Sequence, residues 1–110
     1  MKIKFMDIQD GFLRAKVSDI KQADGIYGSY LRITFTVIEG GNLNHYRFSG
    51  IVKPIPLKQS KFFRWVTNIL GTPPDNSFCV NELLGKECMI FVAKRDKYYS
   101  VIDVSMKPDK

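Results

Sequence analysis

The stretch that decides the fold is Tyr30-Leu31-Arg32-Ile33-Thr34-Phe35-Thr36-Val37. Apolar and polar side chains alternate in it, and β-branched and aromatic residues dominate. This period of two is typical of a β-strand that buries one face and exposes the other. We therefore expect a strand over residues 30–37 whose core side is formed by Leu31, Ile33, Phe35 and Val37. Its outward side would carry Tyr30, Arg32, Thr34 and Thr36.

The same alternation returns on both sides of this stretch. An earlier strand is expected from Phe12, because the following apolar positions are Leu13, Ala15 and Val17. Residues 22–29 contain three turn-forming residues and are expected to form a loop. After a glycine turn at residues 39–42, a third strand is expected from about residue 45 to residue 52. Its phase predicts Tyr46 and Phe48 inward, and His45, Arg47 and Ser49 outward.

One helix is expected after the third strand. Pro54 and Pro56 end the sheet. Ser60 is a suitable N-cap and Gly71 a suitable residue to end a helix, so residues 61–70 should be helical. The apolar side chains of this segment share one arc, which predicts an amphipathic helix packed on the core. One further helical turn is expected at residues 81–84. Two more strands are expected over residues 86–93 and 98–104, joined by a basic turn at residues 94–97.

This order of elements predicts an all-β fold: a five-stranded OB-fold barrel with one α-helix between strands 3 and 4. An SH3-like or other small barrel with an inserted helix is the alternative. The length of 110 residues is typical of one domain. We expect a single OB-fold domain over residues 1–110, with an N-terminal extension at residues 1–10 and a frayed tail at residues 106–110.

Composition excludes several classes of protein. With 45% hydrophobic residues, the chain is too apolar for a disordered protein. No apolar run approaches the roughly 20 residues that span a bilayer, and the first residues do not resemble a signal peptide. We therefore expect a cytoplasmic protein with no membrane partner. Cys79 and Cys88 are expected to be reduced in that compartment.

Catalytic and metal-binding motifs are not found. His45 is the single histidine, and no acid near it in the sequence could orient it as a general base. Two cysteines and one distant histidine do not form a zinc set of familiar spacing, and the acids are scattered. No phosphate-binding glycine loop and no nucleophile elbow occurs. We therefore expect no enzyme, no cofactor and no metal.

Positive charge is concentrated in the middle of the sequence. Glu39 is the one acid between residues 25 and 74, and the six cations of that segment are Arg32, Arg47, Lys53, Lys58, Lys61 and Arg64. Six cations less one acid leave five of the net charge of +6 there. Eight aromatic residues share the segment. Cations mixed with aromatics can hold a phosphate backbone and stack its bases. The alternative is a solvated basic face around an aromatic core. Lys58, Lys61 and Arg64 fall on the outer arc of the expected helix, where they could form a solvated face or a second patch that guides the exit of a bound strand.

An OB-fold binds oligonucleotides on strands 2 and 3 and on the loops that join strands 1–2 and 4–5. Transferred to this chain, that scheme predicts a set of nucleic-acid-binding residues that combines cations, tyrosines and polar side chains. They are Tyr27, Tyr30, Arg32, Thr34, His45, Arg47, Lys94, Arg95, Lys97 and Tyr98. Tyr98 and Tyr99 alternate in face, so one of the two is expected in the core, and the sequence leaves open which.

The chain resembles small phage and prophage single-stranded-DNA-binding-like OB-fold proteins. The resemblance rests on short motifs spread over most of the chain: residues 1–5 with Asp7, Gly11-Phe12, Ala15-Lys16-Val17, Asp19-Ile20, residues 28–37, Ser60-Lys61-Phe62-Phe63-Arg64-Trp65, Ile69-Leu70-Gly71 and Leu84-Gly85-Lys86-Glu87-Cys88. The chain departs from the family at Asn44-His45-Tyr46-Arg47, where a glycine-arginine pair is common. The resemblance implies an accessory role in DNA replication or recombination.

The sequence thus predicts a non-enzymatic module that binds single-stranded nucleic acid by phosphate neutralisation and aromatic stacking. We expect single-stranded DNA as the partner in preference to RNA. A homo-oligomer and contacts with replication or recombination proteins stay open as further partners. The alternative function is a protein-interaction or assembly module that uses the barrel edges or the apolar face of Met89 and Phe91.

Overall fold

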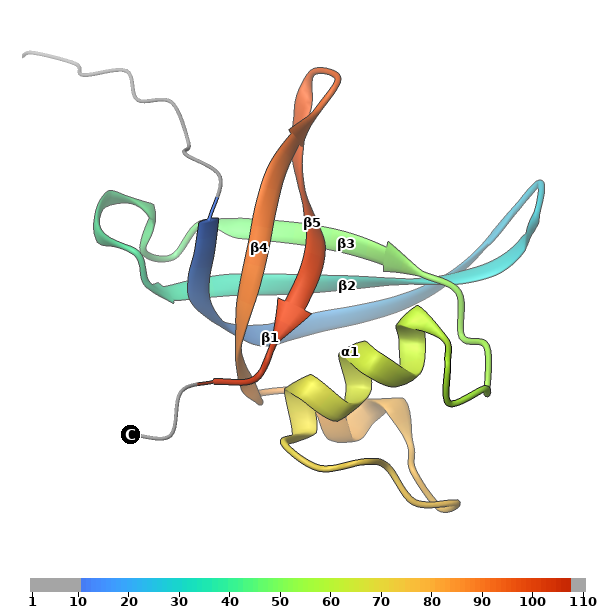
Figure 1. Cartoon of the computed structure of the whole chain (residues 1–110). Coiled ribbons are helices and arrows are strands. Elements are labelled where there is room, and N and C mark those ends of the chain that lie inside the picture. The colour runs from blue at the N-terminus through green and yellow to red at the C-terminus, as the bar shows by residue number, and fades with distance from the viewer. Residues whose placement is uncertain (1–10, 108–110) are drawn as a thin grey trace, which may run out of the picture.

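The computed structural model describes residues 11–107. Five antiparallel strands form one sheet in the order β3-β2-β1-β4-β5, and one α-helix lies between β3 and β4 in the chain (Figure 1). The elements are β1 (Gly11–Gly25), β2 (Gly28–Glu39), β3 (Arg47–Val52), α1 (Lys61–Leu70), β4 (Glu87–Arg95) and β5 (Tyr98–Ser105), with 3-10 turns at Gly41–Leu43 and Val80–Leu83. The expected order of strands and helix is confirmed. The expected extension at residues 1–10, and residues 108–110 of the expected tail, lie outside the described residues.

β2 has the predicted phase. Leu31, Ile33, Phe35 and Val37 are buried, and the side chains between them face outward. Apolar residues of β1, β4 and β5 and the inner side of α1 complete the same core. β2 therefore buries one complete face, as its alternation requires.

The predicted loop at residues 22–29 is wrong. β1 and β2 stay paired to the end of a long hairpin, where Gly25 is opposite Gly28, and Ile26 and Tyr27 alone form the turn. Gly28 has a φ of 107°, which a residue without a Cβ adopts at little cost. The glycines therefore close a two-residue turn instead of opening a longer loop.

The predicted start of the third strand is also wrong. β3 begins at Arg47, and Tyr46 is 58% exposed instead of inward. His45 has a φ of 74°, and its N–H donates to the Val37 carbonyl while the Tyr46 carbonyl accepts from the Val37 N–H. His45 and Tyr46 thus lie opposite the single residue Val37, as in a β-bulge. The extra residue shifts the inward–outward alternation before β3 starts. From Arg47 onward the predicted phase holds, with Phe48 inward and Ser49 outward.

The helix begins and ends as expected. The Ser60 hydroxyl accepts a hydrogen bond from the Phe63 N–H at 3.0 Å, and Gly71 ends the helix with a φ of 82°. Trp65 on the inner side is fully buried and contacts Phe35 edge-on, with ring centroids 6.4 Å apart. The helix therefore covers the core between the β1–β2–β3 part of the sheet and the β4–β5 hairpin (Figure 1).

β3 and β5 are the two edges of the sheet, and the ladders of residues 11–107 do not join them. The prediction of an OB-fold barrel is therefore not confirmed. The two edges nevertheless approach closely, because a Cβ atom on Gly50 would lie 2.8 Å from the Val101 carbonyl oxygen and 2.7 Å from Trp65 Cη2. Only glycine fits at this crossing without displacing a neighbour.

β1 connects the two halves of the sheet. Its first residues, 11–16, pair with β4, and residues 14–25 pair with β2. A register shift between Val17 and Asp19 leaves Ser18 as an extra residue, whose hydroxyl donates to the Thr34 carbonyl at 3.2 Å. β4 and β5 consequently cross the β1–β2–β3 part at a steep angle (Figure 1).

Both cysteines are free thiols, with Cys79 exposed and Cys88 buried. In the described part of the chain, neither α1 nor the short turns provide a helix of the length and apolarity that crossing a membrane requires.

Candidate functional site

The outward face of the sheet is positively charged. Strand pairing places Arg32 between Lys21 and Ile51, and it places Thr36 between Lys16 and Arg47. Residues paired across antiparallel strands point to the same side of the sheet. The face therefore gathers four cations, Lys16, Lys21, Arg32 and Arg47. Asp19 is on the same face and lies 4.0 Å from the Lys21 amine.

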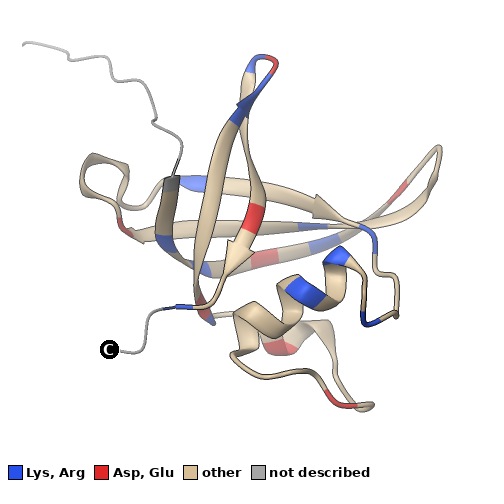
Figure 2. Ribbon diagram, in the orientation of Figure 1, with Lys and Arg blue, Asp and Glu red and all other residues tan. Residues whose placement is uncertain are grey.

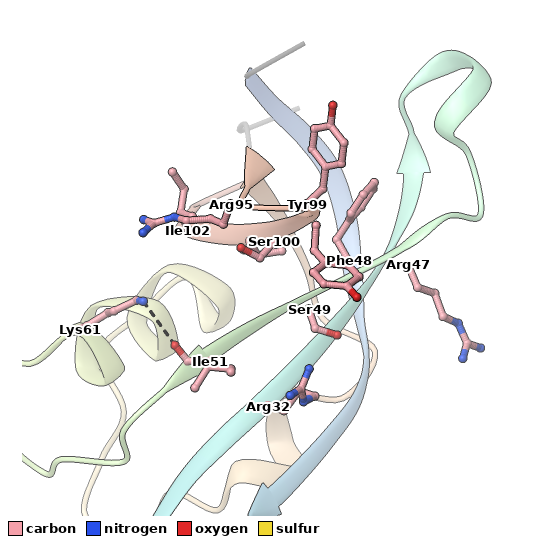
Figure 3. A pocket seen from close by; sticks show the side chains of 12 residues that line it. Arg32, Arg47, Phe48, Ser49, Ile51, Lys61, Arg95, Tyr99, Ser100 and Ile102 are labelled. Carbon is pink, nitrogen blue, oxygen red and sulfur yellow. Dashed lines mark hydrogen bonds between the residues drawn. The ribbon is translucent and has the colours of Figure 1, made fainter. Parts of the chain in front are cut away.

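A groove of about 620 Å³ runs between this face and the β4–β5 hairpin (Figure 3). β2 and β3 form one wall, β5 and the end of β4 form the other, and the first residue of α1 lies at one end. Four of the lining side chains are cations and none is an acid: the cations are Arg32, Arg47, Lys61 and Arg95. Figure 2 shows basic positions on β3, at the start of α1 and at the tip of the β4–β5 hairpin.

The cations are distributed along the groove. Arg47 and Ile51 are four residues apart on β3, which corresponds to about 13 Å along a strand. Arg32 is opposite Ile51, and Lys61 donates a hydrogen bond from its amine to the Ile51 carbonyl at 3.3 Å. Arg32 and Lys61 thus lie toward one end of the groove, with Arg95 near Lys61, and Arg47 lies toward the other end. An extended anionic chain could contact both ends.

Acids of the sheet form ion pairs with cations that do not line the groove. Glu87 lies 2.9 Å and Glu39 lies 3.4 Å from the guanidinium of Arg14, and Asp103 lies 3.0 Å from that of Arg64. Within residues 11–107, no ion pair involves any of the four cations of the groove. Asp19 and Glu39 pair with Lys21 and Arg14 and leave Arg32 and Arg47 without an ion pair there. The positive charge of the groove is available to a ligand.

Lys61 lies close to other positive charges. Its amine lies 4.6 Å from the centroid of the Trp65 ring, a cation–π distance. Partial burial lowers the pKa of Lys61, and the nearby Arg64 and Arg95 lower it further, while Asp103 acts in the opposite direction. The repulsion between these cations would be relieved by an anion bound near them.

The tyrosines at the start of β5 have different environments. Both line the groove, but Tyr98 is 75% exposed, whereas Tyr99 is partly buried and also packs against the core. The alternation of Tyr98 and Tyr99 is thus confirmed, and Tyr98 is the exposed member. A mostly exposed tyrosine ring in a basic groove can stack on a nucleobase or another flat group.

The structure unites part of the predicted site. Arg32, Arg47, Arg95 and Tyr98 line one groove. Thr34 is on the same face of β2, where its hydroxyl lies 3.0 Å from the Ser49 hydroxyl. Tyr30 is also on this face and is half-buried, with its ring against Gly25.

Besides Tyr30 and Thr34, which share the face of β2 but do not line the groove, four more predicted residues lie outside it. Tyr27 is at the tip of the β1–β2 hairpin and is 82% exposed, and His45 is in the loop before β3. Lys94 neighbours Arg95 on β4 and therefore points to the opposite face, and Lys97 is in the turn after it. The geometry does not bring these four into contact with the groove.

Lys61 is the residue that sequence reasoning missed. Its position on the outer arc of the helix left open a solvated face or a second binding patch, and nothing in the local pattern shows that the start of α1 meets β3. The available signal was its membership of the segment with one acid between residues 25 and 74. Ser100 and Ile102 of β5 line the groove as well and had no distinguishing pattern.

Within residues 11–107, no three histidine, cysteine, aspartate or glutamate side chains come together in a way that could hold a metal ion. No protein-family model matches the chain, and no curated protein is significantly similar to it.

Proposed function

We propose that the groove binds single-stranded nucleic acid, DNA in preference to RNA, and that the protein acts by binding and not by catalysis. The observation that carries the proposal is the charge of the groove: its lining includes four cations and no acid, and none of the four cations has an ion pair within the described chain. Binding of phosphates releases counterions from the nucleic acid, and this term supplies most non-specific affinity.

The groove residues divide into two roles. The guanidinium groups of Arg32, Arg47 and Arg95 each present several N–H donors that suit phosphate oxygens. The ring of Tyr98 provides a stacking surface that accepts any base. Such a combination binds a single strand with little sequence preference. Duplex DNA is a poorer ligand because its bases are already stacked on one another.

The fold supports the same proposal. We propose that the open five-stranded sheet with its intervening helix is an OB-fold, a partly open barrel that binds oligonucleotides on strands 2 and 3. The groove is formed by β2 and β3 together with the hairpin after β4, in agreement with that arrangement. An accessory role in DNA replication or recombination follows from the resemblance to phage-type proteins and is part of the proposal.

Fluorescence anisotropy with a labelled oligothymidine tests this function. Affinity should fall as salt rises, with a slope of log affinity against log salt of about −0.7 per phosphate contacted. Three to four contacts therefore predict a slope of about −2 to −3. Failure to bind at low salt, or binding that ignores salt, would disprove the proposal. Competition by unlabelled oligouridine and by a duplex of the same length measures the preference for single-stranded DNA.

Trp65 offers a second readout on unlabelled protein. It is the single tryptophan of the chain, and the Lys61 amine lies next to its ring. A phosphate that approaches Lys61 changes the electric field at the indole. Oligothymidine should therefore change the Trp65 emission in parallel with the anisotropy, and Lys61→Met should reduce that change.

A further inference from the structure

Lys61 lies where two hollows meet. The first is the groove, and the second is a hollow of about 520 Å³ along the outer side of α1. Lys61 lines both. The second hollow is formed by the residues just before α1 and by its first two turns, and its cations are Lys58, Lys61 and Arg64. The groove and this helix-side hollow are therefore continuous through a basic side chain.

Like the groove, the helix-side hollow has no acid among its lining residues. Lys58 has no ion pair within residues 11–107. Arg64 pairs with Asp103, but both side chains of that pair are largely exposed, and an exposed pair contributes about 0–1 kcal/mol. Asp103 also accepts a hydrogen bond from the Val104 N–H at 2.9 Å. Arg64 can therefore exchange part of its contact with Asp103 for a phosphate at little cost.

The arrangement of charge at this junction is unfavourable without an anion. Burial lowers the pKa of the Lys61 amine, and Arg64 on the helix side and Arg95 on the groove side lower it further, with Asp103 acting in the opposite direction. The first turn of α1 contains no acid, although the start of a helix favours negative charge. Cations thus lie on both sides of Lys61, at a helix start where an acid would stabilise the fold of the protein alone.

We propose that a single strand bound in the groove continues past Lys61 into the helix-side hollow, where Lys58 and Arg64 bind its next phosphates. The inference rests on the proposed function and extends it, because it assigns a second set of contacts and a fixed exit for the strand. It predicts that affinity depends on length in two stages. Short oligonucleotides fill the groove alone, and longer ones also reach the helix.

The test uses oligothymidines of about four to sixteen nucleotides, the range of site sizes for one such module. The Lys58→Ala, Arg64→Ala protein is compared with wild type and with Lys86→Ala, Lys107→Ala. The control loses the same net charge at two exposed cations beside Gly71, outside both hollows. Circular dichroism and thermal unfolding confirm that all three proteins are folded.

The wild type and the control should gain affinity beyond a threshold length, and their salt slope should become steeper by about 1.4 for two further phosphates. Between 50 and 200 mM salt, that steeper slope removes about sevenfold more affinity from long oligonucleotides than from short ones. The Lys58→Ala, Arg64→Ala protein should bind short oligonucleotides like wild type. With longer oligonucleotides, neither its affinity nor the steepness of its salt slope should increase. Lys58→Ala alone gives half of this effect and leaves the contact between Arg64 and Asp103 intact.

The outcomes separate the two proposals. If wild type binds no oligothymidine at low salt, the proposed function fails. If wild type binds but the Lys58→Ala, Arg64→Ala protein shows the same length dependence, the function stands and the path along α1 is wrong. An equal loss for short and long oligonucleotides also overturns the path, since it indicates a general effect of charge.

Discussion

Gly50 of β3 and Val101 of β5 cross so closely that a Cβ atom on Gly50 would lie 2.8 Å from the Val101 carbonyl oxygen. Val101 and the neighbours of Gly50, Ser49 and Ile51, all line the groove, so this crossing forms its floor. The Trp65 ring lies below it, with Cη2 2.7 Å from the same position. The floor is thus made by two strand edges that touch without a ladder of hydrogen bonds.

Gly50→Ala should destabilise the fold. The added methyl group meets a backbone carbonyl and a buried ring, neither of which can rotate away, so a loss of about 1–3 kcal/mol in the free energy of unfolding is expected. Urea unfolding followed by Trp65 fluorescence measures it. The neighbouring Ile51→Ala, at a half-exposed position, should change stability less. An unchanged unfolding midpoint for Gly50→Ala would show that the edges are farther apart in solution.

Removal of both sheet arginines from the groove should weaken binding and flatten its salt dependence. For Arg32→Ala, Arg47→Ala, the loss of two phosphate contacts predicts a slope less steep by about 1.4. The Lys86→Ala, Lys107→Ala protein loses the same charge elsewhere and should keep the wild-type slope. Arg32→Lys, Arg47→Lys should retain most of the slope, because the salt dependence of a phosphate contact comes from the positive charge and not from the shape of the side chain. Equal slopes for the two alanine doubles would exclude Arg32 and Arg47 as contacts.

Tyr98 should contribute through its ring. Tyr98→Ala is expected to cost about 1–3 kcal/mol of binding free energy, since it removes one stacking surface, whereas Tyr98→Phe should bind like wild type. Equilibrium anisotropy at fixed salt gives both values. Tyr46→Ala is the matched control, because Tyr46 is also well exposed but lies outside the groove. A similar loss for both alanine variants would argue against stacking on Tyr98.

The two cysteines should differ in reactivity. Burial raises the pKa of the Cys88 thiol to about 12, and the thiolate is the reactive form, so Cys88 should resist alkylation in the native protein. Cys79 is exposed and should react with one equivalent of iodoacetamide at pH 8. Mass spectrometry should find one adduct in buffer and two in denaturant. Native labelling of Cys88 faster than global unfolding would contradict its burial.

The raised pKa of Cys88 also predicts a dependence of stability on pH. The unfolded thiol releases its proton above its ordinary pKa of about 9, while the folded thiol keeps the proton up to about 12. Stability contributed by this group is therefore complete below pH 9 and declines as the pH rises toward 12. The urea midpoint of wild type should fall more between pH 8 and pH 10 than that of Cys88→Ala. Parallel midpoints would show that the thiol does not contribute.

Features of the fold could be predicted from the sequence where residues close together in the chain determine them. The alternation of β2 and the caps of α1 involve neighbours in sequence, so Phe35, Ser60 and Gly71 are placed as expected. The hairpin of β1 and β2 could not be told from a loop, because Gly25 and Gly28 suit both and pairing across the hairpin decides between them. The left-handed conformation of His45 likewise has no signal in its own sequence.

The candidate site divides in the same way. Arg32 and Arg47 were predicted to share a face because strand phase alone fixes where they point. Lys61 was missed because its place depends on how the start of α1 packs beside Ile51, a contact between separate elements. Tyr27 and Lys97 were included by analogy with loops, and the actual reach of the two hairpins leaves them outside the groove.

The extra residue Ser18 in β1 has a mechanical consequence. The two walls of the groove belong to different parts of the sheet, and within residues 11–107 the ladders of β1 alone join those parts. A β-bulge bends its strand and increases the local twist, so the extra residue Ser18 helps to set the angle between the walls. The width of the groove therefore depends on the bend in a strand that does not itself line the groove.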